Sequence, residues 1–376
     1  MKILYVSSST VPSRTANSVH VMKMSQAFAN NGHDVTLIAS EMHATAQPGV
    51  EDVFSHYGVE KNFSLLNLAV PKLPGQGYLF GALSAWHAWR GGYDVVFCRN
   101  FAACYFSALL GKPVIFETHM PMGERKLLGR IFFKRLLKSP RLKQVVVITH
   151  ALKRRMEQDY PQIKGRVVVA PDGADPVADD VVPMSLDAAE GRIQVGYVGH
   201  LYKGKGMEIV SQLAARCPWA DFHVVGGMEE DLDHWKRECA GTDNIVFHGY
   251  VSHQQAKAYI KAFDVVLLPN QRKVAAYDVG EISQWTSPLK AFEYMAAGKP
   301  IIASDLPVLR EVLIEGENAL LCDCEDVEAW GGALARLRDE PTLAKQLAER
   351  AKAIFLEKYT WQARAAALAA TLATRS

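Results

Sequence analysis

Short apolar runs alternate with helix-length segments along both halves of the chain. In the first half, such runs predict buried β-strands at residues 3–6, 35–39, 94–98, 114–116, 145–148 and 167–170. In the second half, they predict strands at 193–198, 222–225, 245–247, 265–268 and 301–303. A helix is predicted at 18–30, where Val21, Met24 and Phe28 form one apolar face and Gly32 follows the last turn. This alternation is typical of parallel sheets covered by helices, so we expect an α/β protein.

The chain is long enough for two domains, because its 376 residues exceed what one hydrophobic core usually supports. The stretch 176–192 is rich in Asp, Pro and Ala and predicts a linker, with one doubly wound, Rossmann-like domain at 1–180 and another at 190–357. Ligands of open α/β sheets bind at the carboxyl ends of the strands. We therefore expect the two domains to face each other across a binding cleft.

Composition and charge narrow the class of protein. Hydrophobic residues make up 49% of the chain and charged residues 22%, which excludes collagen-like and disordered classes. Residues 1–180 hold 21 Lys and Arg against 14 Asp and Glu, a net +7, and residues 181–376 hold 21 against 26, a net −5. Neither half is basic enough to favour nucleic acid as a partner. No apolar run reaches the roughly 18 residues that cross a bilayer, the apolar start is too short for a signal peptide, and the cysteines are scattered. We expect a cytoplasmic protein with free thiols.

One helix is delimited by its own sequence. Ser287 suits the N-cap, Pro288 the first helical position and Gly298 the position after the last turn. The start of this helix, near Leu289, would present free N–H groups that suit a phosphate. Glu293 lies within the helix among apolar neighbours and needs polar partners. A ribose diol and the nearby Lys290 both remain candidates for that partner.

Two further segments carry candidate chemistry. The glycine-rich loop 196–206 brings Lys203 and Lys205 to the end of a predicted strand, where they could meet a pyrophosphate, although surface turns have the same composition. His119 follows the strand predicted at 114–116 and is placed at the cleft. It would act on a sugar hydroxyl or carry a proton, and a purely structural histidine is the alternative.

In order and spacing, these segments resemble the retaining GT-B glycosyltransferases of glycosyltransferase family 4. The matches span nearly the whole chain and comprise residues 1–39 with the loop 12–18, His119, residues 169–175, the loop 199–206, residues 248–251, the helix of Glu293 and residues 359–361. So many ordered matches are far more specific than any single motif. The resemblance implies that the segment 358–376 returns to the first domain as a helix.

The resemblance also implies roles for particular residues. Lys205 matches a lysine that contacts the donor diphosphate, Glu293 a glutamate that holds the ribose, and His119 a histidine near the donor sugar; these three are expected to carry catalysis. The donor-binding residues that the resemblance implies are Gly199, His200, Lys205, Gly249, Tyr250, Val251, Ser287, Pro288, Leu289, Lys290 and Glu293. Asn17 and Ser18 match a turn near the diphosphate and the acceptor.

Two positions depart from the family pattern. Trp285 stands where the family has the first glutamate of its paired-glutamate motif. Asp278 or Glu281 could take its place, or the backbone amides of Ser287, Leu289 and Lys290 could contribute more of the binding. His200 replaces a usual arginine and so carries only a partial charge near pH 7. These departures leave the identity of the sugar open.

The resemblance implies retaining transfer of a sugar from a UDP-, GDP- or ADP-sugar to a hydroxyl of a glycan or lipid-linked acceptor, in cell-surface polysaccharide or glycolipid synthesis. A helix dipole with Lys205, Lys290 and protonated His200 could stabilise the leaving group without a metal. Asp231-Leu232-Asp233 predicts a solvated helix start and not a metal motif, so we expect no metal and no cofactor. A non-hydrolysing nucleotide-sugar epimerase and a non-catalytic nucleotide- or glycan-binding GT-B protein are the alternatives.

A basic stretch lies between Arg125 and Lys143. It contains eight Lys and Arg, no acid, and interleaved Leu, Ile and Phe residues, which predict a basic helix. Such a helix suits an anionic membrane surface, where a peripheral enzyme at the inner face would meet a lipid-linked acceptor. Arg135 falls among apolar positions, so a partly buried helix with extended cationic side chains is the alternative.

Overall fold

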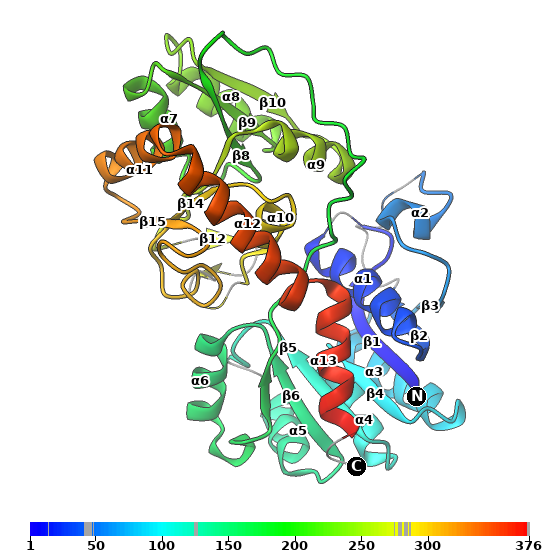
Figure 1. The fold of residues 1–376 in the computed structure, drawn as a ribbon. Helices are drawn as coiled ribbons and strands as arrows, with labels where there is room; N and C mark the ends of the chain where they lie inside the picture. The colour runs from blue at the N-terminus through cyan, green and yellow to red at the C-terminus, as the bar shows by residue number, and fades with distance from the viewer. Residues whose placement is uncertain are drawn as a thin grey trace. The chain divides into compact units, whose positions relative to one another are not determined.

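The computed structural model describes residues 1–13, 15–40, 47, 49–123, 127–273, 275–276, 280–281, 285 and 287–373. The chain forms two compact units, each with its own sheet (Figure 1). Unit 1 comprises Met1–Asp172 and Trp361–Ser376, and unit 2 comprises Gly173–Thr360.

Unit 1 is built on parallel strands with helices between them. Its strands are β1 (Lys2–Thr10), β2 (Asp34–Ser40), β3 (Ser64–Leu68), β4 (Val95–Cys98), β5 (Val114–Thr118), β6 (Leu142–Val147) and β7 (Val167–Val169). Its helices are α1 (Ala16–Asn30), α2 (Val53–Tyr57), α3 (Gln76–Arg90), α4 (Phe101–Leu109), α5 (Leu127–Lys138), α6 (His150–Asp159), the short 3₁₀ helix η1 (Pro161–Ile163) and α13 (Trp361–Ala373). The strand order is β3-β2-β1-β4-β5-β6-β7.

Unit 2 repeats the plan. The strands of its main sheet are β8 (Ile193–Val198), β9 (Ala220–Val225), β10 (Ile245–Gly249), β11 (Val265–Leu268), β14 (Ile301–Ser304) and β15 (Leu320–Cys322), in the order β10-β9-β8-β11-β14-β15. Its helices are α7 (Met207–Arg216), α8 (Glu229–Glu238), α9 (His253–Ala262), α10 (Leu289–Ala296), α11 (Val327–Asp339) and α12 (Pro341–Lys358), and β12 (Ala275–Ala276) pairs with β13 (Gly280–Glu281).

Both main sheets pair in parallel, and both reverse their strand order beside the first strand of the unit. The reversal lies between β1 and β4 in unit 1 and between β8 and β11 in unit 2. At such a point the connections on either side run to opposite faces of the sheet, which opens a crevice at the carboxyl ends of the strands. The fold class predicted from the sequence, α/β with two doubly wound sheets, is confirmed.

Alternating side chains of the central strands explain why each sheet is covered on both faces. In β11, Val266 and Leu268 pack into one buried cluster of unit 2, and Val265 and Leu267 pack into the other. Successive side chains of a strand point to opposite faces, so an unbroken apolar run requires two covering layers. Most of the runs predicted as strands therefore lie in the cores, whereas the edge strand β10 is partly exposed, with Val246 40% exposed.

Several segments differ from the sequence predictions. The strands β3 and β15 were not predicted, because β3 is a half-exposed edge strand without β-branched residues and β15 is only three residues long. The basic helix α5 ends at Lys138, and Lys143 belongs to the strand β6. The stretch 176–192 lacks helix and strand as predicted, but its Val177 and Leu186 pack against the core of unit 2.

The last helix of the chain is part of unit 1. α13 packs against α1. The Asn31 side-chain amide donates to the backbone carbonyl of Gln362, and the Gln362 side-chain amide donates to Oδ1 of Asn31. Unit 1 is thus completed by residues that follow unit 2 in the sequence. Figure 1 shows this as the red helix α13 beside the blue helix α1.

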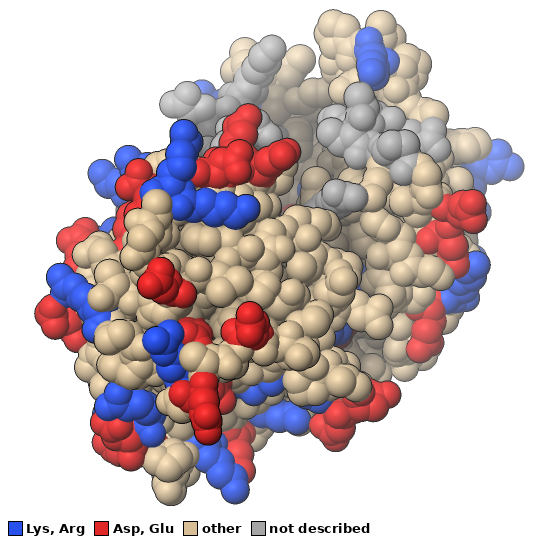
Figure 2. Space-filling view, turned by 90° about the horizontal axis from the view of Figure 1, so that it is seen from above, with Lys and Arg blue, Asp and Glu red and all other residues tan. Residues whose placement is uncertain are grey.

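Surface charge is mixed on the face drawn in Figure 2, where acidic and basic side chains lie interspersed among uncharged ones. The six cysteines are free thiols, as predicted. Among the described residues, no helix is long and apolar enough to span a membrane.

Candidate active site

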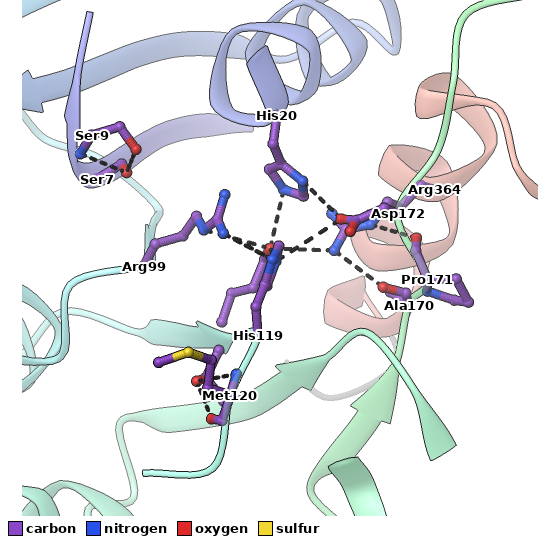
Figure 3. Close-up of polar contacts among 12 residues, drawn as sticks. Ser7, Ser9, His20, Arg99, His119, Met120, Ala170, Pro171, Asp172 and Arg364 are labelled. Carbon is purple, nitrogen blue, oxygen red and sulfur yellow. Dashed lines mark hydrogen bonds and ion pairs between the residues drawn. The ribbon is translucent and has the colours of Figure 1, made fainter. Parts of the chain in front are cut away.

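A buried polar cluster lies at the carboxyl end of the unit 1 sheet. Glu117 lies near the end of β5, His119 directly follows β5, Arg99 follows β4, and Asp172 lies shortly after β7 (Figure 3). α1 adds His20 and α13 adds Arg364. Parallel strands bring their carboxyl ends to one edge of the sheet, which explains why residues so far apart in sequence meet here.

Glu117 is the centre of this cluster. Its side chain is fully buried, and its Oε1 lies 2.7 Å from Nε2 of His119, 3.1 Å from Nε2 of His20 and 3.4 Å from Nη2 of Arg364. Burial raises the pKa of this carboxyl, but Arg364, His20 and His119 together hold that pKa well below its usual range. Glu117 is therefore ionised and can only accept hydrogen bonds.

His119 is a neutral ring with one defined tautomer. Burial and the nearby Arg99 lower the pKa of His119 to about 4, so the ring is uncharged at neutral pH. Because Glu117 accepts the Nε2 proton, Nδ1 is the unprotonated nitrogen, and Nη2 of Arg99 lies 3.0 Å from it. His119 follows a buried strand as predicted, but in this arrangement it does not carry a proton at pH 7.

Unit 2 places its candidate groups at the equivalent point of its own sheet. Gly199 follows β8, and a Cβ atom added there would lie 1.6 Å from Nζ of Lys290. Because Gly199 has no side chain, the Lys290 ammonium can occupy this space, where it lies 5.6 Å from the centre of the Tyr197 ring. Burial and the neighbouring Lys205 lower the pKa of Lys290 to about 7.

The loop that carries Lys205 is fixed against the end of β11. Gly206 has a φ of +84°, and a Cβ atom there would lie 1.8 Å from the carbonyl oxygen of Pro269, so glycine alone fits. Gln271 donates its backbone N–H to the carbonyl of Gly204 at 2.9 Å. Lys205 is half-buried and lies 5.2 Å from the centre of the Tyr202 ring.

His200 does not supply a lasting positive charge in this loop. Burial lowers its pKa, and Lys290 and Lys205 lower it further. The ring is therefore mainly neutral near pH 7. Lys205 of the loop and Lys290 of α10, and not His200, are the cations available here to an anionic ligand.

Glu293 lies beside a hollow of unit 2. The hollow is lined by Ala174, Asp175, Val177, His253, Ala256, Lys257, Ile260 and Glu293. The Glu293 side chain is 28% exposed, and its Oε1 lies 4.0 Å from Nδ1 of His253. The Lys290 ammonium is directed toward Gly199 and Tyr197, so Glu293 is left with exposed carboxylate surface for a ligand.

The helix that carries Glu293 begins one residue later than predicted. Pro288, and not Ser287, is the N-cap of α10, and no side chain caps this end. Ser287 is buried, and its carbonyl accepts the backbone N–H of Leu289 at 3.0 Å. Gly298 follows the last turn with a φ of +63°, as predicted.

The remaining predicted residues lie at the ends of strands and helices and on loops of either unit. In unit 2, Gly249 ends β10, Tyr250 is 65% exposed, and Val251 packs against the core. In unit 1, Asn17 is exposed on the first turn of α1, whereas the buried Ser18 hydroxyl donates to carbonyls of its own loop. Asp231 and Asp233 lie in the first turns of α8, as predicted. Asp278 and the Glu281 side chain lie outside the described residues.

Sequence reasoning missed five members of the unit 1 cluster: His20, Arg99, Glu117, Asp172 and Arg364. Arg99 directly follows β4, Glu117 lies in β5 and Asp172 lies shortly after β7, so their places at the ends of strands were a usable signal. Arg364 gave none, because only the packing of α13 brings it to Glu117.

Comparison with known families decides the identity. The family model described as "Glycosyltransferase Family 4" matches residues 18–177, and the model described as "Glycosyl transferases group 1" matches residues 182–354. Together they cover most of the chain. The chain belongs to glycosyltransferase family 4. It is an enzyme of a family that uses nucleotide-sugar donors and retains the anomeric configuration, as the resemblance in the sequence implied.

Individual relatives of this glycosyltransferase are distant. The D-inositol 3-phosphate glycosyltransferase of Xylanimonas cellulosilytica is 24% identical over 408 residues, which cover 93% of this chain and 89% of that protein. An uncharacterised glycosyltransferase of Methanocaldococcus jannaschii is 30% identical over 178 residues, which cover 46% of this chain and 42% of that one.

Solved structures show the fold of this glycosyltransferase. Sucrose-phosphate synthase from Thermosynechococcus elongatus has a TM-score of 0.72 at 19% identity, with 99% of this chain and 98% of that chain covered. HepE from Anabaena in complex with UDP has a TM-score of 0.71 at 15% identity, with both chains fully covered. These likenesses confirm the GT-B fold.

Metal independence of this glycosyltransferase remains a prediction. Among the residues that the structure describes, His20, Glu117 and His119 hold ligand atoms within 4.8 Å of one another, close enough for a metal ion. Arg99 and Arg364, at 3.8 and 3.4 Å from the same carboxylate oxygen, already supply positive charge there. A dication would be repelled by them. We expect the transfer rate to be unchanged in EDTA, and a loss of activity that manganese restores would contradict this.

Proposed function

We propose that this glycosyltransferase moves a sugar from a UDP-sugar, bound by unit 2, to a hydroxyl of a glycan or lipid-linked acceptor, bound by unit 1. The observation that carries the donor assignment is the pair Lys205 and Lys290 at the strand-order reversal of the unit 2 sheet. Two partly desolvated ammonium groups beside a backbone without a side chain at Gly199 suit a diphosphate. Glu293 would accept hydrogen bonds from the ribose, and the residues 249–251 would border the base.

The chemistry follows from the charges of these groups. Transfer needs stabilisation of the negative charge that develops on the departing nucleoside diphosphate. Lys205 and Lys290 would supply it, together with the N-terminal N–H group of α10 at Lys290. The other residues of the predicted donor site, including Ser287 and Pro288, would shape the backbone at this end of α10.

Uridine is favoured as the base by the structural neighbours. The titles of the HepE structures name UDP, UDP with glucose, and UDP-glucose. A further neighbour, with a TM-score of 0.66, has bound UDP-2-fluoroglucose. Those ligands belong to those proteins, and their likeness to this chain supports UDP ahead of GDP or ADP.

The experiment that tests the function has two stages. Thermal shift with UDP, GDP and ADP identifies the base, because a ligand that binds only the folded chain raises its melting temperature. Release of the nucleoside diphosphate from the matching donor sugar is then measured with and without glycan or lipid acceptors. Release that depends on an acceptor supports the proposal. Isomerisation of the donor without an acceptor would indicate an epimerase, and tight binding without turnover a binding protein, and either would overturn it.

Donor binding is expected to weaken as the pH rises above 7. The pKa of Lys290 is about 7 without ligand, and the donor diphosphate would favour the charged ammonium. Below pH 7 the Lys290 ammonium is already charged, whereas above pH 7 donor binding has to take up a proton. The dissociation constant of the donor should therefore increase, by up to about tenfold for each pH unit above 7. Calorimetry in buffers of different ionisation enthalpy measures this uptake. Lys290→Arg should bind without it, since arginine stays charged; equal proton uptake in both proteins would refute the assignment.

The acceptor side of the proposal places α5 at an anionic membrane surface. Leu127, Leu128 and Ile131 are 71%, 62% and 37% exposed, and they alternate with the exposed cations Arg130, Lys134, Arg135 and Lys138. Arg125 and Lys126 lie outside the described residues. α3 adds the exposed side chains Leu79, Leu83, Trp86 and Trp89, and its Tyr78 contacts Phe132 of α5 edge to face at 5.9 Å. Exposed apolar and aromatic groups beside cations suit the interface of an anionic bilayer.

Charge reversal on α5 should weaken membrane binding. Lys134→Glu is expected to reduce co-sedimentation with phosphatidylglycerol vesicles by about tenfold or more, because each cation near such a surface contributes about 1 kcal/mol. Arg154→Glu makes the same change at an exposed site of α6 and should have little effect. Equal losses in both variants, or equal binding to neutral phosphatidylcholine vesicles, would argue against an α5 surface.

A further inference from the structure

The buried charges of the unit 1 cluster are not explained by a contribution to the stability of the fold. Two carboxylates, Glu117 and Asp172, are buried with two guanidinium groups, Arg99 and Arg364. Buried ion pairs rarely stabilise a protein more than apolar side chains of the same volume. Glu117 Oε2, Arg99 Nη1 and Arg364 Nη1 are also buried and make no hydrogen bond to any residue that the structure describes. An arrangement made for stability would satisfy such atoms, so the cluster is better explained by what it does to a neighbour.

That neighbour is His119, whose side chain is 23% exposed while the side chains of Glu117 and Arg364 are 0% and 2% exposed. His119 is thus the member of the group through which the cluster reaches a ligand. Glu117 accepts a hydrogen bond from the Nε2–H group of His119 at 2.7 Å. This contact fixes both the orientation of the His119 ring and the nitrogen that carries the proton. The exposed edge of the ring is then held in a single state.

Arg364 holds Glu117 in turn. Its Nη2 lies 3.4 Å from the Glu117 carboxylate and donates to the carbonyl of Ala170 at 3.2 Å, and its Nε donates to the carbonyl of Pro171 at 2.9 Å. One planar side chain therefore ties the end of β5 to the segment after β7. Lysine could not make these contacts together, because it offers a single charged centre and no planar fork.

His20 holds the carboxylate from the other side. Its Nε2 lies 3.1 Å from Glu117 and its Nδ1 lies 2.9 Å from Asp172. Trp361, on the first turn of α13, packs its ring against the His20 ring at 5.1 Å between centroids and an interplanar angle of 82°. α13 thus supports Glu117 twice, directly through Arg364 and indirectly through Trp361 and His20; Figure 3 shows Arg364 and His20 on two sides of the cluster.

We propose that Arg364 and His20 are positioning residues of the transfer reaction, which hold Glu117 so that His119 keeps one orientation and one tautomer. The proposal rests on the proposed function and on the expectation, from the family resemblance, that His119 lies near the donor sugar. The last helix of the chain is then part of the catalytic apparatus of unit 1. Neither Arg364 nor His20 touches the substrate.

The test compares Arg364→Met with Arg166→Met. Arg166 is the matched control, because it is a half-buried arginine of unit 1 that also donates to backbone carbonyls, of Leu142 and Gln162, and it does not contact the cluster. Folded Arg364→Met is expected to lose about 100-fold in kcat with the donor KM unchanged, the size of loss that misplacement of a reacting group causes. Folded Arg166→Met should keep its kcat, and an equal loss of kcat in both would overturn the proposal.

A spectroscopic signature keeps the test independent of activity. In protein labelled with ¹⁵N-histidine, the His119 signals are assigned by their loss in His119→Asn, and the shifts of the two ring nitrogens report which one carries the proton. The wild-type protein should show Nε2 protonated and Nδ1 unprotonated, whereas Arg364→Met should show a mixture of the two tautomers. Glu117→Gln, which keeps the shape of the side chain, should show the same mixture and provides the readout if Arg364→Met does not fold. Wild-type tautomer shifts in the variants would overturn the proposal even if the enzyme were inactive with every donor tried, so its failure is distinct from failure of the proposed function.

Discussion

Lys205→Ala is expected to lower kcat by about 100-fold or more, the usual cost of removing one preorganised group that stabilises charge in a transition state. The Lys205 ammonium is half-buried on a loop that Gly206 and Gln271 fix against the end of β11. Burial lowers its pKa, which is the mark of a cation with reduced hydration. Such a charge interacts strongly with the negative charge that develops on the departing diphosphate.

Lys203→Ala is the matched control for this variant. Lys203 lies two residues away on the same loop and is exposed, so its removal changes the net charge of the loop equally. It should leave kcat within about twofold, since exposed charges are screened by water and salt. Initial rates at saturating donor separate kcat from KM, and thermal unfolding checks that both variants are folded. Equal loss in the two variants would mean that Lys205 acts only through the overall charge, and the diphosphate assignment would fail.

Glu293→Gln should raise the donor KM by about tenfold to 100-fold and leave kcat nearly unchanged. The carboxylate is partly exposed beside the hollow of unit 2, where it would accept two hydrogen bonds from the ribose diol. Hydrogen bonds to a charged acceptor each contribute about 1.5–3 kcal/mol, and a neutral amide keeps only part of that. The ribose is remote from the reacting bond, so the loss should fall on ground-state and transition-state binding alike.

A double-mutant cycle with the ligand isolates this contact. UDP and 2′-deoxy-UDP are titrated into the wild-type protein and into Glu293→Gln by calorimetry. The wild-type protein should bind the deoxy ligand more weakly, and the variant should scarcely distinguish the two, because the partner of the missing hydroxyl is gone. Equal discrimination in both proteins would place the ribose elsewhere.

The fold could be predicted from the sequence because buried parallel strands leave a local signal. Runs such as 193–198 and 265–268 are apolar on both faces, and their position in the chain is independent of what packs on them. The edge strand β3 lacks this signal, since it is half-exposed and its apolar residues are leucines, which are common in helices. The N-cap of α10 was misplaced by one residue for a related reason, since burial of Ser287 overrides its capping preference.

The residues of the candidate site also fall into two groups, those with a local sequence signal and those without one. Lys205, Lys290 and Glu293 lie on segments whose glycines and helix signals are local, so their sequence placed them at strand and helix ends. The partners of His119 gave no such pattern, because their contacts depend on strand order and on the packing of α13.

The sequence by itself determined the α/β class, the membership of glycosyltransferase family 4 and the segments that carry the donor-site lysines, because each depends on residues close together in the chain. Only the tertiary structure decided the states of the ionisable groups. It shows that His119 is neutral with its proton on Nε2 and that His200 is not a lasting cation. It also brings Arg364 of the last helix to Glu117. The physical reason is that a pKa and a tautomer are set by burial and by charges a few ångströms away in space, which the order of residues along a chain does not specify.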